Sequence, residues 1–272
     1  MTFAAVHLAG VTFDAVTEAQ AVDVVRQALE RGEGGWIFTP NVDILRQATS
    51  DVASGASLVV ADGAPLVWAS RLAGTPLPAR VPGSDLVWSL ARMAGAANRS
   101  LFLLGGAPSG HPGGPPGDDS GEPRSRRPGG SLTGARRAAD VLRADCPGLR
   151  IAGTLSPPFR FDRDPVLVED VREELVEAKP DVVYVGLGYP RQEQVIAMLR
   201  PHLPGAWFLG CGGAINFLAG DRRRAPVWMR RCGLEWLHRL GAEPRRLWRR
   251  YLRDDAPYAL RLLLGAIRSR YR

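Results

Sequence analysis

The sequence predicts an α/β fold in which a parallel sheet carries helices on both faces. Two observations point to this class. Apolar runs of four to six residues alternate with segments of helical periodicity between residues 36 and 209, which is typical of strand–helix–strand units. Most of these runs end at Gly, Asp or Asn, as expected at the carboxyl edge of a parallel sheet, where ligands bind.

The first half of this pattern contains two strands and two helices. Residues 36–39 form an apolar run after a Gly-rich turn and predict a strand, followed by a helix over 41–53. Residues 57–62 predict a buried strand that ends in Asp62, and residues 66–72 predict a helix with one apolar face.

The middle of the chain contains a break in the pattern. A helix is expected over 85–97 and a strand over 100–104, and helix and strand resume over 135–143 and 149–153. Residues 107–130 are dense in Gly, Pro, Ser and charged side chains and cannot bury apolar area, so they predict a disordered surface insertion.

The remaining elements of the body follow the same alternation. Residues 166–177 form an amphipathic helix and 181–185 a β-branched, apolar strand. A helix over 191–199 is expected to have Pro190 at its first position, and residues 206–209 predict the last strand.

The C-terminal residues differ from the body in charge. Residues 221–272 contain 15 Arg and 5 acidic side chains, whereas residues 1–220 have a net charge of −3. We therefore predict two parts, a catalytic domain over 1–220 and a basic appendage over 221–272. Helices are expected over 228–240 and 244–253, followed by an apolar stretch over 258–267.

The basic appendage allows three interpretations. Its Arg, Trp and Tyr side chains could bind nucleic acid, or anionic lipid, with aromatic and Leu side chains in the interface and Arg at the phosphates. It could also be a solvated helical surface that packs on the body. Residues 244–253 place aromatic and Leu side chains on one helical face and Arg on the other, which favours the membrane interpretation.

Several function classes are disfavoured. The three cysteines are widely spaced and the four histidines scattered, so neither a disulfide framework nor a metal site is expected. The N-terminus lacks the pattern of a signal peptide, and no run of 18 apolar residues exists. A cytoplasmic protein is expected. Neither GxGxxG nor GxxxxGK[ST] occurs, which weighs against nicotinamide dinucleotides and P-loop chemistry.

The strand ends provide the candidate site. Glycines there let backbone N–H groups approach a phosphate or sugar closely. Asp62 is either a turn or capping residue or a general base that accepts a proton from a sugar hydroxyl. The candidate strand-end glycines are Gly186, Gly188, Gly212 and Gly213.

Three further side chains have two interpretations each. Arg80 is either solvated or a bidentate phosphate ligand. Gln192 and Glu193 open a helix, where they either stabilise its N-terminus or bind a ligand at that positive end.

Several strings in this order resemble the WecG/TagA/CpsF family of bacterial glycosyltransferases over about residues 10–255. The strings are ADG at 61–63, RVPGSD at 80–85, VGLGYPRQE at 185–193, GDRRRAP at 220–226, GLEWLHRL at 233–240 and EPRRL at 243–247. Three features depart from the family pattern. The stretch from Asn41 to Asp62 is about five residues shorter than is usual in the family, so the intervening helix or turn is trimmed. Asn216 stands where the family usually has Asp, which puts a charged role there in doubt, and the 107–130 insertion is atypical.

The resemblance implies a modified Rossmann-like fold of the GT-E type and an activity. The family transfers N-acetylmannosamine or a related sugar from a UDP-sugar to polyprenyl-diphosphate-linked N-acetylglucosamine, with inversion and without a metal or cofactor. Such enzymes build cell-surface polysaccharide or teichoic-acid-type polymers. The family's basic appendage docks on the inner face of the plasma membrane, so a peripheral location and an anionic membrane surface as partner are implied. Nucleic acid is not an expected partner, and the oligomeric state, monomer or homo-oligomer, stays open.

The resemblance also assigns roles to residues. Asp62 matches the proposed base, Thr39 and Asn41 the pocket-lining residues, Arg80 the diphosphate ligand and Gln192 a residue beside the sugar. Thr39 and Gln192 are thereby expected to act with Asp62 in catalysis. The further expected substrate-binding residues are Gly83, Asp85, Glu193 and the appendage arginines Arg224, Arg231 and Arg239.

A second function class fits the same composition. A nucleotide- or nucleic-acid-binding protein without enzymatic activity could use the Arg-rich appendage. A salt-dependent interaction with DNA and no affinity for UDP would favour this alternative.

Overall fold

The structure is a computed structural model that describes residues 3–48, 53, 55–107, 133–222 and 224–270. It divides into two compact units. The first contains residues 1–31, 35–89 and 224–272, and the second contains 32–34 and 90–223. Apart from Ala107, the predicted insertion over 107–130 lies outside the described residues.

The first unit begins with three elements that the sequence interpretation did not include. Strand β1 (Ala5–Leu8) pairs antiparallel with β2 (Val11–Asp14). Helix α1 (Glu18–Glu30) begins with a capping box, in which the Thr17 side chain accepts from the Gln20 N–H and the Gln20 side chain accepts from the Thr17 N–H.

The first unit also contains two parallel strands. Strand β3 (Gly35–Phe38) pairs with β4 (Leu58–Val59). The predicted strand over 57–62 is thus too long. The Asp62 N–H still donates to the Pro40 carbonyl at 3.0 Å, but Pro40 has no N–H with which to continue the ladder.

Three helices of this part of the chain follow these strands. They are α2 (Val42–Gln47), α4 (Ala64–Leu72) and α5 (Gly83–Ala96), the last of which continues into the second unit. The continuous helix expected over 41–53 is interrupted, because α2 ends at Gln47 in an extended Ala48. Residues 49–52 of this range lie outside the described residues, and Ala53 is helical.

The second unit contains four parallel strands in the order β8-β7-β5-β6. Their bounds are β5 (Ser100–Gly105), β6 (Arg150–Leu155), β7 (Val182–Gly186) and β8 (Trp207–Gly210). The four corresponding predicted strands are confirmed to within two residues at each end. Buried Phe102, Tyr184 and Phe208 fill the core around them.

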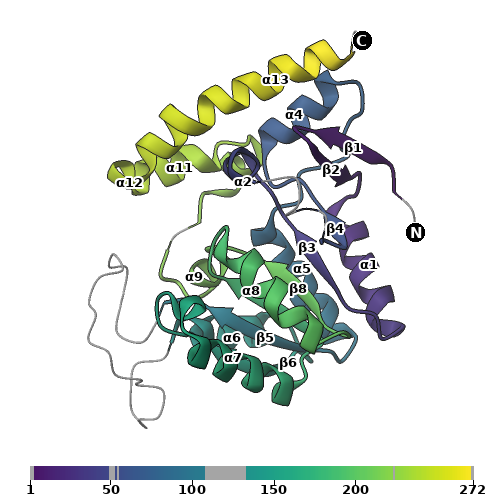
Figure 1. The fold of residues 1–272 in the computed structure, drawn as a ribbon, viewed down its shortest axis with the longest axis vertical. Coiled ribbons are helices and arrows are strands. Elements are labelled where there is room, and N and C mark those ends of the chain that lie inside the picture. The colour runs from purple at the N-terminus through teal and green to yellow at the C-terminus, as the bar shows by residue number, and fades with distance from the viewer. Residues whose placement is uncertain (1–2, 49–52, 54, 108–132, 223, 271–272) are drawn as a thin grey trace. The chain divides into compact units, whose positions relative to one another are not determined.

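Helices flank these strands (Figure 1). They are α6 (Gly134–Asp145), α7 (Pro165–Ala178), α8 (Arg191–Leu199) and the short α9 (Ala214–Leu218), which was not predicted. Pro190 is the residue before the first turn of α8 and not its first position. Parallel strands flanked by helices confirm the predicted Rossmann-like α/β class.

The basic C-terminal residues are helical, as predicted, but their boundaries differ. They form α10 (Val227–Arg231), α11 (Glu235–Ala242), α12 (Pro244–Trp248), a π-helical turn η4 (Arg249–Asp255) and α13 (Ala256–Arg270). The single helix expected over 228–240 is wrong, because Gly233 with φ of +74° separates α10 from α11.

This C-terminal segment belongs to the first unit. Helix α13 packs along α4, and η4 packs against α2. Residues 224–272 therefore form one compact unit with the N-terminal residues. The expected division into a catalytic domain over 1–220 and an appendage over 221–272 was based on the distribution of charge and on the family resemblance. It stays a prediction.

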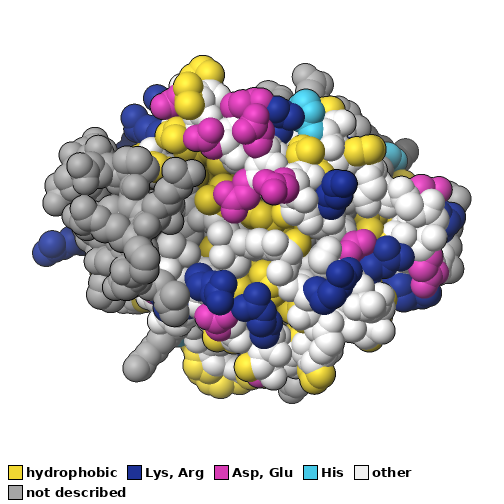
Figure 2. Space-filling model, turned by 90° about the horizontal axis from the view of Figure 1, so that it is seen from below, with side chains coloured by type: hydrophobic (Ala, Val, Ile, Leu, Met, Phe, Trp, Pro, Cys, Tyr) yellow, Lys and Arg dark blue, Asp and Glu magenta, His cyan; other side chains and the backbone are white. Residues whose placement is uncertain are grey.

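The charge of the surface and the length of the helices are relevant to the expected membrane and nucleic-acid partners. The face in Figure 2 shows acidic and basic side chains with apolar ones between them, so its charge is mixed. Among the described residues, every helix is too short or too polar to cross a bilayer.

Candidate functional site

Asp62 lies in the first unit where the ends of two strands meet. Its N–H donates to the Pro40 carbonyl at 3.0 Å, so Asp62 sits beside the segment that contains Thr39 and Asn41. The Val81 N–H donates to the Ala61 carbonyl at 2.9 Å, which brings Arg80 to the other side of Asp62. The backbone thus gathers residues from three separate stretches of sequence.

Thr39 and Asn41 are held firmly in this arrangement. Thr39 is buried. The Asn41 side chain caps α2 by accepting from the Ile44 N–H at 3.0 Å. A Cβ added to Gly63 would lie 4.0 Å from the Asn41 Cβ, so Asn41 is adjacent to the turn that follows Asp62. Its capping role accounts for its side-chain oxygen, and a role in substrate binding stays a prediction.

The Asp62 side chain does not cap the helix that follows it. The residue that precedes α4 is Gly63, and no side chain caps this helix. The half-buried Asp62 carboxyl forms no hydrogen bond to any residue that the structure describes. The lack of a capping role removes one of the two interpretations of Asp62. The remaining interpretation, that of a general base, stays a prediction.

The surroundings of Asp62 raise its pKa to about 6. Burial is the main cause, because it penalises the charged form. The guanidinium groups of Arg239 and Arg80 lower the pKa in part, while Glu235 and Asp85 raise it. A carboxyl with this pKa is ionised at neutral pH and basic enough to accept a proton.

The arginines beside Asp62 are held by two acidic side chains. Glu235 lies 3.5 Å from the Arg80 guanidinium and 2.9 Å from that of Arg239. Asp85 lies 2.6 Å from Arg224 and 3.5 Å from the nearest nitrogen of Arg230, and a third guanidinium, that of Arg80, is 4.0 Å away.

The Asp85 side of this group is fixed by the start of α5. Arg224 also donates to the Ser84 carbonyl at 3.2 Å and to the Ser84 hydroxyl at 2.6 Å. Gly83, another expected binding residue, is the first residue of α5. Four arginines, Arg80, Arg224, Arg230 and Arg239, thus gather with two acidic residues in the same unit as Asp62. We call these six residues the arginine cluster.

The sequence interpretation missed two members of the arginine cluster. Neither Glu235 nor Arg230 was assigned a role, although both lie in or beside the GLEW string. Glu235 and Arg239 are four residues apart, the spacing at which oppositely charged side chains meet on a helix, and this signal was available. The expected binding residue Arg231 ends α10, but its side chain lies outside the described residues.

The other predicted site residues belong to the second unit. Gln192 is buried, and both its amide oxygen and its amide nitrogen form hydrogen bonds. Its oxygen accepts from the Gly212 N–H at 2.9 Å, and its nitrogen donates to Glu193 at 2.8 Å. A Cβ at Gly210 would lie 2.7 Å from the Gln192 nitrogen. Gln192 therefore fastens α8 to the end of β8, and a role beside the sugar stays a prediction.

Glu193 is a buried acid next to Gln192. Burial raises its pKa to about 7, opposed by the hydrogen bonds from Gln192 and from its own backbone. Its Oε2 atom is buried and accepts no hydrogen bond from a described residue.

The predicted glycines of this unit follow β7 and β8. Gly186 is the last residue of β7, where a Cβ would lie 2.7 Å from Ile215. Gly188 and Gly212 have φ of +76° and +53°, and a Cβ at Gly188, Gly212 or Gly213 would meet open space. The Gly212 N–H already donates to Gln192, so a binding role for these glycines stays a prediction.

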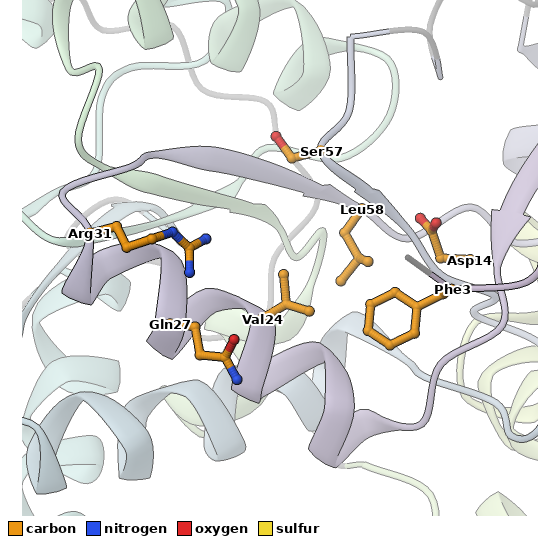
Figure 3. Close-up of a pocket in the computed structure, with 7 residues that line it drawn as sticks. All are labelled: Phe3, Asp14, Val24, Gln27, Arg31, Ser57 and Leu58. Atoms are coloured by element: carbon orange, nitrogen blue, oxygen red, sulfur yellow. The ribbon is translucent and has the colours of Figure 1, made fainter. Parts of the chain in front are cut away.

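A cavity in the first unit lies away from these residues. It measures about 250 Å³ and has none of the predicted site residues in its lining. Figure 3 shows α1 on one side of it, with Val24 and Gln27, and Arg31 directly after the last residue of the helix. The lining is completed by Phe3, Asp14, Ser57 and Leu58.

In the part of the chain that the structure describes, no three His, Cys, Asp or Glu side chains are grouped so that they could hold a metal ion. The three cysteines are free, with Cys146 and Cys211 buried and Cys232 exposed.

Known proteins resemble this chain over most of its length. The pattern of the glycosyl transferase WecG/TagA/CpsF family matches residues 6–111 and 128–272. An N-acetylglucosaminyldiphosphoundecaprenol N-acetyl-β-D-mannosaminyltransferase of Bacillus spizizenii is 30% identical over 82% of this chain and 77% of its own length. Proteins with the same name from Bacillus subtilis and Staphylococcus aureus are 31% and 27% identical over 85% and 90% of this chain, and 79% and 88% of theirs.

These matches cover the strings on which the resemblance was based, and the matched residues include the whole arginine cluster. The chain therefore belongs to the WecG/TagA/CpsF family and is a glycosyltransferase.

Proposed function

We propose that this glycosyltransferase transfers N-acetylmannosamine from a UDP-sugar to polyprenyl-diphosphate-linked N-acetylglucosamine, with inversion at the anomeric carbon and without a metal ion. The observation that carries the proposal is the Asp62 carboxyl, whose pKa is raised to about 6 beside an arginine cluster. The names of the relatives support this choice of sugar and acceptor.

The chemistry of an inverting transfer needs one base. Asp62 accepts the proton of the acceptor hydroxyl as that oxygen attacks the anomeric carbon. The new C–O bond forms while the bond from the anomeric carbon to the donor diphosphate breaks on the opposite face, and the nucleoside diphosphate leaves. A carboxylate without a hydrogen-bonding partner is available for this task, and Asp62 is such a carboxylate among the described residues.

The departing diphosphate needs positive charge. Arg80 and Arg239 face Asp62 closely enough to lower its pKa. Arg224 and Arg230 form ion pairs with Asp85. Guanidinium groups bind phosphate oxygens in a bidentate manner. They supply the electrostatic stabilisation that a divalent cation gives in other transferases.

The acceptor also gives the C-terminal segment a role. Large apolar side chains remain exposed there although the segment packs on the first unit, including Trp228, Trp236, Trp248, Leu252 and Leu260. Trp beside Arg is typical of a surface that lies in the headgroup region of an anionic membrane. We place the enzyme on the inner face of the plasma membrane, where it meets the lipid-linked acceptor.

The test is a turnover assay of the full chain. UDP-N-acetylmannosamine and other UDP-sugars are offered with a short-chain polyprenyl-diphosphate-linked N-acetylglucosamine, with and without EDTA. We expect product with the β-anomeric configuration, unchanged by EDTA. Product from a different donor sugar would overturn the assigned sugar, loss of turnover in EDTA would overturn metal independence, and no product from any donor would overturn the function.

A further inference from the structure

Glu235 joins two arginines from distant parts of the sequence. It is the first residue of α11 and only 9% exposed. One carboxylate oxygen lies 3.5 Å from the Arg80 guanidinium, and the other accepts from Arg239, one helical turn later, at 2.9 Å. A carboxylate with both oxygens occupied in this way fixes the positions of both guanidinium groups.

The backbone before Glu235 is fastened to the helix that follows Asp62. Gly233 has φ of +74°, which favours glycine. A Cβ at Gly233 would lie 2.6 Å from the Ala64 Cβ and 3.8 Å from Trp68. The turn before α11 therefore packs directly against Ala64, the first residue of α4, which follows Asp62 by two positions. This contact fixes Glu235 relative to the Asp62 carboxyl.

The charge of Glu235 acts on Asp62 in the opposite direction to the arginines. Arg239 and Arg80 each lower the pKa of Asp62, while Glu235 and Asp85 raise it. These four residues are the charged groups that face Asp62 from the Arg80 segment, α5 and α11. Burial alone would raise the pKa of Glu235, but Arg239, Arg224 and Arg80 outweigh it and hold that pKa below its ordinary value. Glu235 is therefore ionised at neutral pH.

We propose that Glu235 is a positioning residue that holds Arg80 and Arg239 beside Asp62 and neutralises part of their charge, so that Asp62 stays a usable base. The proposal rests on the proposed function of Asp62. Two unneutralised guanidinium groups beside a carboxylate would make it a weaker base. Glu235 thus allows the site to combine cations for a diphosphate with a base for a hydroxyl.

The test measures the pKa of Asp62 directly in the full chain. Carbon-13 NMR of proteins labelled at the Asp carboxyl gives a titration curve, and Asp62→Asn identifies the Asp62 signal. We expect Glu235→Gln to move the Asp62 pKa down by about one unit. Glu30→Gln is the matched control, because Glu30 also pairs with an arginine in the first unit, Arg26, but on the exposed face of α1. The control should leave the Asp62 pKa unchanged.

A second variant keeps the proposal falsifiable if Glu235→Gln fails to fold. Arg239→Gln removes one guanidinium and should move the Asp62 pKa up. An unchanged or opposite shift in either folded variant would overturn the proposal. The titration needs no turnover, so it separates this inference from the proposed function. An enzyme that turns over but shows no pKa shift refutes Glu235 alone, and one that shows the shift without turnover refutes the function alone.

Discussion

Arg224 donates to the Asp85 carboxylate at 2.6 Å and, through the same guanidinium, to the carbonyl and hydroxyl of Ser84. These hydrogen bonds connect Arg224, which lies three residues before α10, to the first turn of α5. Charge-assisted hydrogen bonds of this kind are about twice as strong as neutral ones. The basic C-terminal segment is therefore attached to the first unit at a defined place, and that place is part of the arginine cluster.

Arg224→Ala should loosen this attachment and weaken catalysis together. We expect the free energy of unfolding to fall by about 2 kcal/mol, because Asp85 and Ser84 lose a charged partner, and kcat/KM to fall by about tenfold or more. Chemical denaturation and initial rates measure the two effects. Arg245→Ala is the control, since Arg245 is an exposed arginine of the same segment. Equal losses in both variants would mean that net charge alone is responsible.

Asp62→Asn should abolish turnover and leave the fold intact. In the unchanged protein, kcat/KM should rise with pH through about 6, because only the carboxylate accepts a proton. Initial rates between pH 5 and 8 check this. Near-normal turnover of Asp62→Asn would show that Asp62 is not the base.

The same variant should be more stable than the unchanged protein at pH 7.5. The pKa of Asp62 is raised on folding, so the folded state holds its proton over about pH 4 to 6 and stability decreases as pH rises through this window. The ionised carboxyl then costs up to about 3 kcal/mol above pH 6. Thermal unfolding at pH 5 and 7.5 measures the difference. A lower Tm for Asp62→Asn at pH 7.5 would contradict a burial-raised pKa.

Gly233→Ala should detach α11 from α4. The substitution places a Cβ 2.6 Å from the Ala64 Cβ and forces a side chain into φ of +74°, which should cost more than about 1 kcal/mol. Limited proteolysis and Tm report the loss. Adding Ala64→Gly should restore part of it by removing the clash. Gly241→Ala, with nothing within 4 Å of the added Cβ, is the control and should be neutral or slightly stabilising.

Strands β5, β7 and β8 could be predicted from the sequence because each is an apolar run that is almost wholly buried. Strand β6, at the end of the strand order, is only half-buried, and its position was predicted from the alternation of strands and helices. Residues 57–62 have the same pattern, yet the strand stops at Val59. The apolar side chains specify burial, while the missing N–H of Pro40 on the neighbouring strand limits pairing. Such a limit depends on the partner strand and is not visible in the run itself.

In the predicted site too, some residues can be recognised from their neighbours in sequence, whereas others depend on contacts between residues far apart in the chain. Asp62 could be found from its place at a strand end, and Arg80 from its neighbouring string. Their relation to Glu235 depends on the contact of Gly233 with Ala64, more than 160 residues apart, which no local pattern encodes. The helix expected over 228–240 failed at the same glycine, because a positive φ ends a helix that the apolar spacing alone would continue.

Glu193 should make stability depend on pH in the second unit. Burial raises its pKa to about 7, so the folded state keeps this proton where the unfolded chain has lost it, and stability falls as pH rises from about 4.5 to 7. Glu193→Gln removes the titrating group. We expect the decrease in Tm between pH 5.5 and 8 to be smaller in this variant. An unchanged decrease would assign the pH dependence to other groups.

Trp228 should contribute to membrane binding without contributing to the fold. Its side chain is 62% exposed and lies in the basic segment, so its loss removes little packing. At the interface of an anionic vesicle it should contribute on the order of 1.5 kcal/mol, and Trp228→Ser should weaken binding to vesicles with 30% phosphatidylglycerol by about tenfold. Phe159→Ser is the matched control, because Phe159 is also aromatic and 62% exposed but belongs to the second unit. Co-sedimentation measures both. If the two variants bind equally well, the exposed aromatic side chains of the C-terminal segment do not hold the enzyme on the membrane.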